Sequence, residues 1–365
     1  MSILLIINSL YFILNLVFIY TWLKMKNTTV QYVSPKNTKL TIIIPVRNEE
    51  DNIKNLLEDI NKQTYPFKNF EVIIANDGST DKTETIVLAF QEVAHFDLKL
   101  LNILNENSLS PKKNAIQKSI EISSGELIIT TDGDCIVTAN WLTSIEEIYK
   151  QNDARLISSP VTFLNEKSFS NTFQIIEFAS LIGSGACAMY LKKPNMCNGA
   201  NIAYTREVFE EVNGFAGNEH LASGDDEFLM HKIADKYPEN VVFNMDINAI
   251  VHTKSQPDFT HFYQQRKRWA SKWKHYKDWK VGALAIFIFA VNLGMIYSFL
   301  VQDYFNLVLK CLPEFIFLFL IINYLGHKNK IKFIPIVQVI YPFYVVFFGL
   351  ISQGTGYNWK GRKLS

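Results

Sequence analysis

The sequence predicts an α/β domain with a parallel sheet, flanked by apolar segments that are long enough to cross a membrane. Four short, continuous apolar runs alternate with amphipathic stretches, and such runs are typical of parallel strands that are covered on both faces. The expected strands are residues 40–46, 70–75, 98–104 and 126–131. Apolar residues at helical spacing predict helices at 53–60, 83–90 and 111–121.

The composition narrows the class of protein. A chain of 365 residues is long enough for one domain of ordinary size and several membrane segments. The net charge of +1 argues against a nucleic-acid partner, because proteins built around nucleic acid normally carry a strong basic excess. Cys135, Cys187, Cys197 and Cys311 show no CxxC spacing, so we expect reduced thiols in a cytosolic environment rather than disulfides or a zinc site.

The N-terminal segment predicts a membrane anchor. Residues 3–23 form an almost uninterrupted apolar stretch of the length that crosses a bilayer. A cleaved signal peptide is the alternative, but no charge precedes the segment and no small-residue cleavage site follows it. Lys24 and Lys26 follow directly, and the positive-inside rule then places the downstream domain in the cytoplasm. We expect residues 1–24 to be the anchor and 36–280 the cytosolic domain.

Residues 281–365 predict about three further membrane helices and a basic tail. The second helix carries Lys310 and Glu314, which indicates a tilted helix, a helix partly buried in protein, or an internal charge pair. The three expected segments are 281–301, 304–326 and 333–352.

The charged loops leave the number of C-terminal crossings open. Basic residues at 272–280 and 327–330 are typical of cytoplasmic loops. A third crossing would place the basic tail at 360–363 on the other side, against the same rule. Pro342 would reconcile the two if it broke the last segment into two half-passages that return to the cytoplasm.

Polar clusters follow three of the predicted strands. They lie at residues 47–50, 76–81 and 132–134. Ligands of open parallel sheets bind at the carboxyl ends of the strands. We therefore expect these three clusters to converge on one edge of the sheet and to form the functional site.

Asp132 and Asp134 are candidate metal ligands. Two aspartates one residue apart provide hard oxygen ligands that suit Mg²⁺ or Mn²⁺ bridging a diphosphate, and the metal would neutralise charge as that diphosphate departs. An isolated pair of this kind more often marks a turn, and its position at a strand end is what favours a metal. Asp77, at the end of another strand, is a candidate acceptor for a hydrogen bond from a nucleoside.

Two charged clusters open helices. Lys112 and Lys113 are cations at a helix start, where they oppose the macrodipole, so they indicate either diphosphate contact or a solvated lysine pair. Asp225, Asp226 and Glu227 precede an apolar helix. Helix capping is one interpretation, and general-base chemistry on a hydroxyl is the other, since mutual repulsion would make a carboxylate more basic.

The run Gln-Gln-Arg-Lys-Arg-Trp at residues 264–269 precedes the first C-terminal membrane segment. A basic and aromatic belt at the membrane interface is the plain interpretation. It explains the charges and the rings but not their order.

These motifs follow one another along the chain as IPVRNEE, ANDGSTD, PKKNAI, TDGDC, CNGANIAYTREVFEEVNGF, GDDEFL and QQRKRW. From about residue 39 to 279 this order resembles the membrane-bound family-two inverting glycosyltransferases, which include cellulose, hyaluronan and poly-N-acetylglucosamine synthases and ceramide glucosyltransferases. The resemblance implies a Rossmann-like nucleotide-sugar-binding domain of the GT-A type, a divalent metal, and a single displacement at the anomeric carbon.

The resemblance also implies roles for individual residues. Asp226 corresponds to the catalytic base, which usually follows a glutamate, and here Asp225 takes the place of that glutamate. Asp132 and Asp134 correspond to the metal and diphosphate motif, whereas His252 is either a further metal ligand or structural. The implied donor-binding residues are Pro45, Glu49, Asp77, Lys112, Asp132, Gln265, Arg266, Arg268 and Trp269. The implied acceptor-side residues are Asn201, Asp225 and Trp269.

We therefore expect an integral protein of a bacterial inner membrane with a cytoplasmic catalytic domain. It would transfer a sugar from a nucleotide donor, UDP-linked by the resemblance, to a polysaccharide or lipid acceptor at the bilayer. Two alternatives stay open. One is a metal-dependent nucleotidyltransferase, although residues 40–60 lack the glycine-rich phosphate loop that such enzymes usually carry. The other is a membrane transport or interaction protein with an inactive cytosolic domain.

Overall fold

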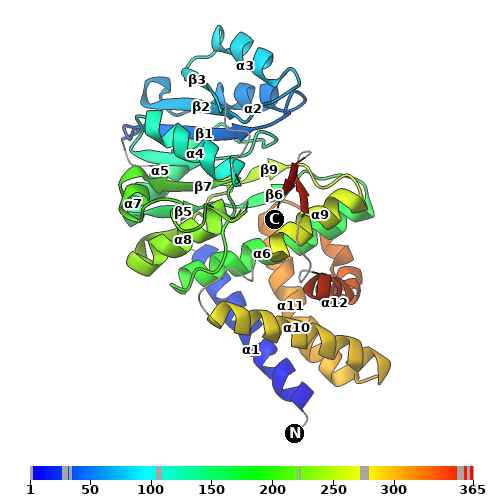
Figure 1. Cartoon of the computed structure of the whole chain (residues 1–365). Helices are drawn as coiled ribbons and strands as arrows, with labels where there is room; N and C mark the ends of the chain where they lie inside the picture. Colours follow the sequence, from blue (N-terminus) through cyan, green and yellow to red (C-terminus); the bar gives the residue numbers. More distant parts are fainter. Residues whose placement is uncertain are drawn as a thin grey trace. The chain divides into compact units, whose positions relative to one another are not determined.

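The computed structural model describes residues 3–26, 32, 35–103, 109–219, 221, 223–271, 279–351, 357–359 and 362–364 (Figure 1). The chain divides into two compact units, and each unit collects segments that lie far apart in the sequence. The α/β unit consists of Thr28–Leu164 and Ala188–Lys254. The helical unit consists of Met1–Asn27, Asn165–Cys187 and Ser255–Ser365. The helical unit thus takes two segments from the range predicted for the cytosolic domain.

The α/β unit is built on a central sheet and a small second sheet. Its strands are β1 (Leu40–Val46), β2 (Phe70–Asn76), β3 (Asp97–Asn102), β4 (Leu127–Thr130), β5 (Leu156–Ser158), β6 (Val161–Phe163), β7 (Ile202–Thr205), β8 (Val241–Phe243) and β9 (Val251–Thr253). The described strands of the central sheet run in the order β3-β2-β1-β4-β7-β5-β8, and β6 pairs with β9. The four predicted strands run parallel to one another, whereas β7 runs antiparallel to β4 and β5.

Helices connect these strands. They are α2 (Ile53–Ile60), α3 (Thr83–Gln91), α4 (Pro111–Ile122), α5 (Trp141–Asn152), α7 (Arg206–Glu211) and α8 (Asp225–Lys236), with short 3₁₀ turns at Phe67–Asn69, Pro238–Asn240 and Ile247–Ala249. The three helices predicted from spacing are confirmed as α2, α3 and α4. In α2 the buried side chains are Ile53, Leu56, Leu57 and Ile60, the spacing of one helical face. Each such side chain contributes roughly 1.5–3 kcal/mol when it is fully buried.

The register of the parallel strands brings the three polar clusters to one edge. Val46 at the end of β1 pairs with Asn76 at the end of β2, and Ile43 pairs with Thr130 at the end of β4. The strand β4 therefore ends beside Ile43, three residues before the end of β1, and the loop after β4 starts there. Residues 47–50, 76–81 and 132–134 all leave the sheet at this edge, which we call the carboxyl rim.

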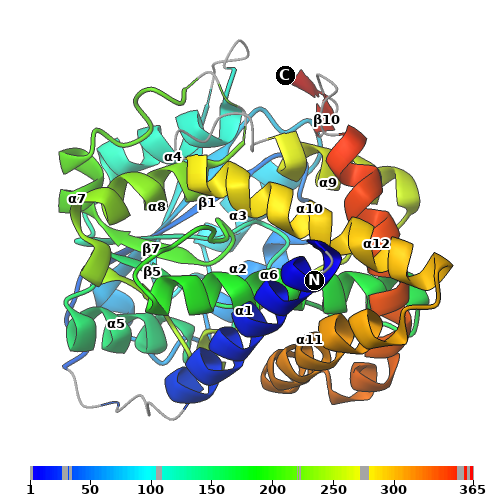
Figure 2. The same ribbon diagram turned by 90° about the horizontal axis from the view of Figure 1, so that it is seen from below.

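The helical unit contains the apolar segments. Its elements are α1 (Ile3–Lys26), α6 (Phe169–Tyr190), α9 (Phe259–Ser271), α10 (Trp279–Leu300), α11 (Tyr304–Tyr324), η5 (Lys328–Phe333), α12 (Ile334–Ile351), β10 (Tyr357–Trp359) and β11 (Arg362–Leu364) (Figure 2). Within the described chain, five helices are long and apolar enough to cross a membrane: α1, α6, α10, α11 and α12 together with η5. The prediction of one N-terminal and about three C-terminal helices is confirmed.

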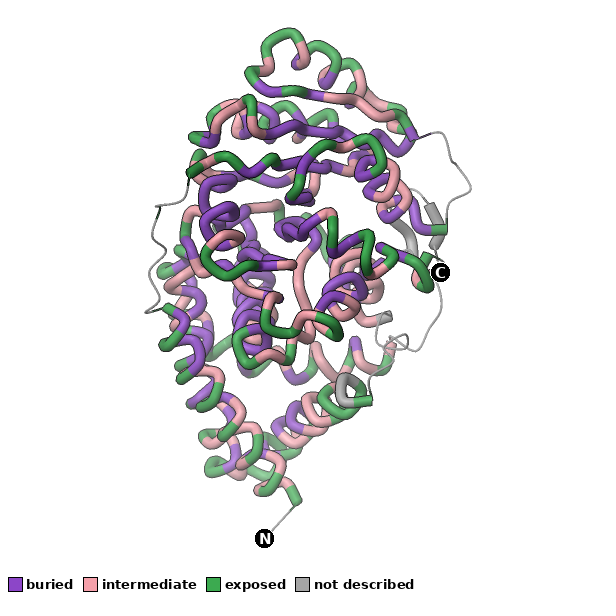
Figure 3. Tube along the Cα trace, turned by 90° about the vertical axis from the view of Figure 1, so that its left-hand side faces the viewer, coloured by how far each residue is buried: buried purple, intermediate pink, exposed green. Residues whose placement is uncertain are grey.

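Among these five helices, α6 differs from the others because most of it is buried inside the protein. The helix α1, near the N label in Figure 3, consists mainly of exposed and half-buried residues instead. For residues 163–193, the apolar residues and a patch of small residues at 183–186 predict a helix that packs on the domain or lies at the membrane surface, and α6 is a packed helix. Its Gly183 permits close contact with α11, because a Cβ there would lie 1.9 Å from Cδ1 of Ile321.

Two questions about the C-terminal segments are answered by the structure. Lys310 and Glu314 form an internal pair on α11, with 2.8 Å between Nζ and Oε2. The alternative in which Pro342 divides the last segment does not hold, because α12 continues through it as one helix. The basic residues 272–278, and residues 360 and 361 of the tail, lie outside the described residues.

Candidate functional site

The rim begins with a link between the loops that follow β1 and β2. Nη1 of Arg47 donates hydrogen bonds to the carbonyl oxygens of Asp77, at 2.6 Å, and Gly78, at 3.1 Å. The backbone N–H of Asp77 donates to the carbonyl of Val46 at 2.9 Å, and the Asp77 side chain is buried. Gly78 has a φ of 61°, a conformation that favours glycine and turns the loop away from the strand.

Glu49 and Gly133 bring the loop of β1 against the loop of β4. Glu49 is buried, and its Oε2 accepts a hydrogen bond from the Asn52 side chain at 2.8 Å. A Cβ at Gly133 would lie 3.1 Å from Cγ of Glu49 and equally close to Val46. Glycine between the two aspartates therefore lets the metal-ligand loop approach the end of β1. Pro45, the other residue predicted to line the nucleotide site, is half-buried in β1.

Lys112 is the electrostatic centre of the rim. Its Nζ lies 2.8 Å from Oδ1 of Asp132 and 3.4 Å from Oδ2 of Asp225. Burial alone would lower the pKa of Lys112, but the carboxylates of Asp132, Asp225 and Asp226 outweigh it and hold the pKa above its ordinary value. The interpretation as a solvated lysine pair is wrong, because Lys113 is also buried and donates to backbone carbonyls.

Asp134 points to the second sheet of the unit. Its Oδ2 accepts a hydrogen bond from the hydroxyl of Thr253 at 3.0 Å. The neighbouring His252 exchanges two backbone hydrogen bonds with Ile136, and burial lowers the pKa of its imidazole. In the described part of the chain, no three His, Cys, Asp or Glu side chains gather as a metal-ligand cluster. His252 therefore fits the structural interpretation better than that of a metal ligand.

Asp226, the predicted base, lies in the first turn of α8. Its Oδ2 accepts a hydrogen bond from the backbone N–H of Gly199 at 2.8 Å. The Gly199 carbonyl in turn accepts from the hydroxyl of Thr130, at the end of β4. A Cβ at Gly199 would lie 3.1 Å from Oδ2 of Asp225 and 3.3 Å from Nζ of Lys112. Gly199 thus ties the acids of α8 to β4 and leaves space for the lysine.

Sequence reasoning missed Gly199, because a residue without a side chain carries no chemical signal. It also predicted that the acids of α8 repel one another. In the structure the ammonium of Lys112 pairs with Asp225, so a cation compensates part of that charge. Capping and chemistry are compatible here, since Asp225, Asp226 and Glu227 occupy the first helical turn while two of them face the rim.

Asn201, which the resemblance places on the acceptor side, is bonded within the protein. Its side chain is fully buried, and its Nδ2 donates to the carbonyls of Pro160, at 2.9 Å, and Ala249, at 2.7 Å. Its Oδ1 accepts from the indole N–H of Trp141 at 3.0 Å. All three partners belong to the protein, so Asn201 holds these segments together, and its acceptor-side role stays a prediction.

The remaining predicted residues belong to the helical unit, on α9. Arg266 is buried and forms an ion pair with Glu177 of α6, with 2.6 Å between Nη2 and Oε2. The Tyr344 hydroxyl donates to the same carboxylate at 3.0 Å. The guanidinium also lies over the rings of Phe262, at 4.5 Å, and Trp269, at 4.2 Å.

This arrangement separates the residues of the α9 motif by role. Arg266 is enclosed by protein partners, so it is a poor candidate for the predicted contact with the donor, and it also engages the side-chain oxygen of Gln265. Trp269 stacks on Phe178 with 5.8 Å between ring centroids. Arg268 is half-buried and stays the better candidate for a phosphate contact.

The sheet and the charged carboxyl rim define an α/β protein of the GT-A-like class. Two family models match the chain: Glycosyl transferase family 2 over residues 41–212, and Glycosyl transferase family group 2 over residues 127–351. The chain belongs to the family 2 glycosyltransferases. The alternative of a nucleotidyltransferase is therefore wrong.

Individual relatives agree with this family. The chain is 29% identical over 187 residues to Glycosyltransferase AglE of Haloferax volcanii, covering 51% of this chain and 58% of that protein. It is 30% identical over 185 residues to a poly-beta-1,6-N-acetyl-D-glucosamine synthase of Staphylococcus aureus, covering 50% and 42%. The matches thus span less than two thirds of the length of these relatives.

A solved structure supports the fold. The mannosyltransferase PcManGT from Pyrobaculum calidifontis, in complex with GDP-Man and Mn²⁺, superposes with a TM-score of 0.59 at 15% identity. The match covers 93% of this chain and 98% of that one. At this identity the likeness concerns the fold alone.

Proposed function

We propose that the protein is an inverting glycosyltransferase that moves a sugar from a nucleoside-diphosphate donor to a hydroxyl of a membrane-associated acceptor. The observation that carries this proposal is the position of Asp226. Its carboxylate is held by the Gly199 N–H, in a cluster where Lys112 connects Asp225 of the same helical turn to Asp132. A base beside the candidate diphosphate site is what a single displacement requires.

In this proposal the residues of the rim divide the chemistry between them. Asp226 accepts the proton of the acceptor hydroxyl, which attacks the anomeric carbon from the face opposite the leaving diphosphate. Lys112 stabilises negative charge on that diphosphate, because a buried ammonium acts more strongly than one in water. Asp77 binds the nucleoside, with Glu49 beside it. Gln265, Arg268 and Trp269 of α9 stay predicted donor-binding residues.

The aspartates at the end of β4 fit a divalent metal when the donor supplies further ligands. Asp132 and Asp134 offer two carboxylates, and Mg²⁺ commonly binds through one or two carboxylates together with substrate phosphates and water. When bound, Mg²⁺ or Mn²⁺ would neutralise charge on the diphosphate. The Mn²⁺ in the PcManGT complex is consistent with this assignment.

The donor and the location are also part of the proposal. The resemblance favours a UDP-linked sugar, whereas the PcManGT complex holds GDP-Man, so both nucleotides belong in the test. Lys24 and Lys26 lie in the last turn of α1. By the positive-inside rule they favour a catalytic unit in the cytoplasm of a cell whose inner membrane holds the apolar helices.

The test uses membranes that contain the full chain, incubated with radiolabelled UDP- and GDP-sugars. Label is then counted in the aqueous phase, the organic-solvent phase and insoluble material. The wild type should transfer one of these sugars. Asp226→Asn should abolish transfer and keep donor binding, since it removes the base and little volume. Asp235→Asn is the matched control, because Asp235 is exposed on the same helix. Normal turnover by the Asp226 variant would refute the role of Asp226.

A further inference from the structure

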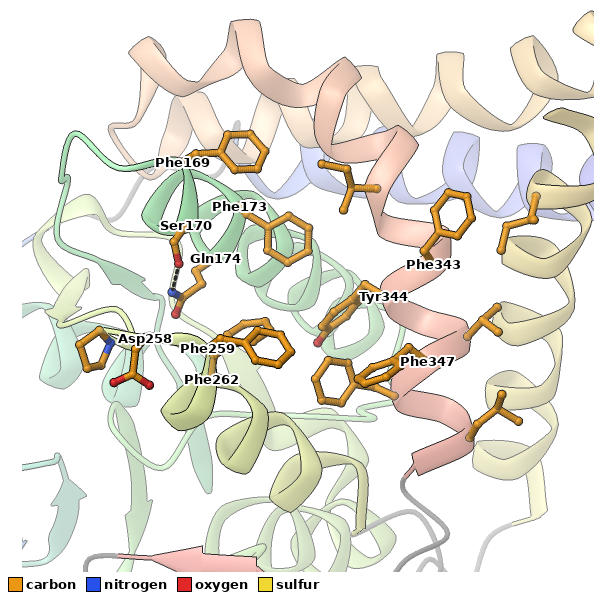
Figure 4. Close-up of a pocket in the computed structure, with 16 residues that line it drawn as sticks. Phe169, Ser170, Phe173, Gln174, Asp258, Phe259, Phe262, Phe343, Tyr344 and Phe347 are labelled. Carbon is orange, nitrogen blue, oxygen red and sulfur yellow. Dashed lines mark hydrogen bonds between the residues drawn. The ribbon is translucent and has the colours of Figure 1, made fainter. Parts of the chain in front are cut away.

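The helical unit contains a large apolar cavity that the transfer chemistry does not use. It has a volume of about 930 Å³ and lies between the start of α6, the start of α9, one residue of α10, and α12. This is the upper part of the range in which small molecules bind, roughly 300–1,000 Å³. The rings of Phe173, Phe262, Tyr344 and Phe347 point into the same space (Figure 4).

The few polar side chains of the lining are already hydrogen-bonded within the protein. Gln174 bonds through both amide atoms to the backbone of Gln256, at 2.8 and 3.0 Å, and its Nε2 reaches the Ser170 hydroxyl at 3.2 Å (Figure 4). Tyr344 donates to a buried glutamate of α6, and Asp258 accepts from a histidine of α9. A sugar chain would bring hydroxyl groups that these side chains cannot satisfy, whereas a hydrocarbon chain needs no such partners.

The surroundings of the cavity indicate where a hydrocarbon chain would come from. One side is formed by α12, with Ile296 of α10 beside it, and both helices are long and apolar enough to cross a membrane. Several lining side chains remain partly open, with Phe343 54% and Leu350 63% exposed. In a bilayer such open apolar side chains are surrounded by lipid chains.

The opposite wall is the helix that carries the family motif. Phe262 of α9 lines the cavity and lies under the guanidinium of Arg266, one turn further along the same helix. Arg268 follows six residues after Phe262, on the order of 9 Å along the axis at 1.5 Å per residue. The helix α9 is therefore apolar where it borders the cavity and cationic where it carries the motif. These two parts match the apolar chain and the polar headgroup of an amphiphile.

We infer that this cavity binds the hydrocarbon chain of the acceptor, and that the acceptor is consequently a membrane lipid rather than a polysaccharide. The inference rests on the proposed function for the transfer itself and adds the class of acceptor. The lipid chain lies among Phe173, Phe262 and the α12 side chains, and α9 directs the lipid headgroup toward the motif residues.

The test fills the cavity and follows both binding and transfer. Val346→Trp places an indole in the cavity, and Val339→Trp is the matched control, since Val339 lies on the same helix, is 46% exposed and is not part of the lining. The full chain in nanodiscs is irradiated with a photoactivatable long-chain fatty alcohol, and labelled peptides are mapped. We expect labelling within residues 257–262 and 340–350, reduced about tenfold by Val346→Trp and unchanged by Val339→Trp.

Transfer provides the second readout. With the donor that the wild type accepts, label should enter the organic-solvent phase, and Val346→Trp should lower this at least tenfold while donor binding is retained. The inference would be overturned if both variants were labelled equally, or if the label were spread uniformly along α10 and α12. Displacement of the probe by chitotetraose would also overturn it. Label in insoluble polymer alone would also overturn it and leave the proposed function intact. A wild type that transfers no sugar would defeat the proposed function, and the photolabelling would still decide what the cavity binds.

Discussion

Two lysine–carboxylate pairs, one in each unit, have the same short distance and opposite surroundings. Lys112 lies 2.8 Å from Asp132 on the carboxyl rim, where the side chains are 20% and 40% exposed. Lys310 lies 2.8 Å from Glu314 within α11, where they are 1% and 11% exposed. The carboxylate of Glu314 also accepts hydrogen bonds from Tyr11 and Gln338.

We infer from this difference that an ion pair can serve a ligand site when its partners remain exchangeable. The Lys310 pair is closed on all sides by protein groups, so it stabilises one arrangement of helices. The Lys112 pair connects α4, α8 and the loop after β4, and it keeps the Asp132 carboxylate partly open to solvent. A ligand that brings phosphate and metal can therefore replace protein partners there, at a small cost in desolvation.

Metal removal should have the largest effect on sugar transfer, and it should act at the solvent-accessible pair of Lys112 and Asp132, which we call the open pair. Chelation with EDTA is expected to abolish sugar transfer, because the diphosphate then loses its counter-charge. The melting temperature should change little, since Lys112 continues to neutralise Asp132. Radiolabel transfer and thermal unfolding, each measured before and after Mn²⁺ is restored, check both parts. Full transfer in EDTA would contradict the metal assignment.

Lys112→Ala should have the second-largest effect on sugar transfer. Loss of a positioned cation at a developing negative charge typically costs about 100- to 1,000-fold in rate, and we expect this decrease in kcat/KM. Lys118→Ala on the same helix is the control and should remain near the wild-type value, because Lys118 is only half-buried and outside the rim. A loss of less than threefold for Lys112→Ala would show that the open pair is merely structural.

Lys310→Met should act on stability instead. Removing the ammonium leaves a buried Glu314 carboxylate without its cation, which costs about 3 kcal/mol. The free energy of unfolding in detergent should fall by this amount, while transfer per folded molecule is retained. The double variant Lys310→Met with Glu314→Gln should recover most of the loss, because no buried charge remains. If the double variant is as unstable as the single one, the pair does not act as a unit.

A third pair, intermediate in exposure, should give the smallest effect. Burial alone would raise the pKa of Glu71, but hydrogen bonds from Lys99, Ser124 and Thr41 outweigh it and lower the pKa from 4.5 to about 2. A lowered pKa means that this stabilisation is complete above pH 4.5 and is lost as the pH falls toward 2. Glu71→Gln should remove about 1–2 kcal/mol at pH 7 and flatten the pH dependence in that window, measured as melting temperature against pH.

The parts of the fold that depend on local sequence patterns are predicted well from the sequence. The strand β1 was predicted with its exact residues, and β2 and β4 within one residue at each end, because their runs are continuous and apolar. The strands β5, β6 and β8 were missed, since three residues are too few to show a period. The helix α6 was recognised, but its burial depends on contacts such as Gly183 with Ile321, which no local pattern reveals.

The sequence predicts which loops form the site better than it predicts the role of each residue in them. Asp132 follows β4 and Lys112 opens the helix after β3, so both lie beyond the carboxyl ends of parallel strands, and the strand-end argument anticipates this for Asp132. Asn201 and Arg266 were assigned to ligands by resemblance, yet their partners are protein groups. Glu177, the partner of Arg266, lies 89 positions away in the sequence. Such pairing is a property of tertiary packing, and a motif does not distinguish a residue that binds a ligand from one that holds the motif in place.

The order in which the chain visits its two units has a practical consequence for biochemistry. The segment Asn165–Cys187 joins the helical unit although it lies between two parts of the α/β unit. A soluble fragment made by trimming both apolar ends would keep α6 and lose α11, whose Ile321 covers Gly183. The exposed helix would then promote aggregation. Activity is therefore best reconstituted from the full chain in a lipid environment, and failure of a trimmed fragment would say nothing about its chemistry.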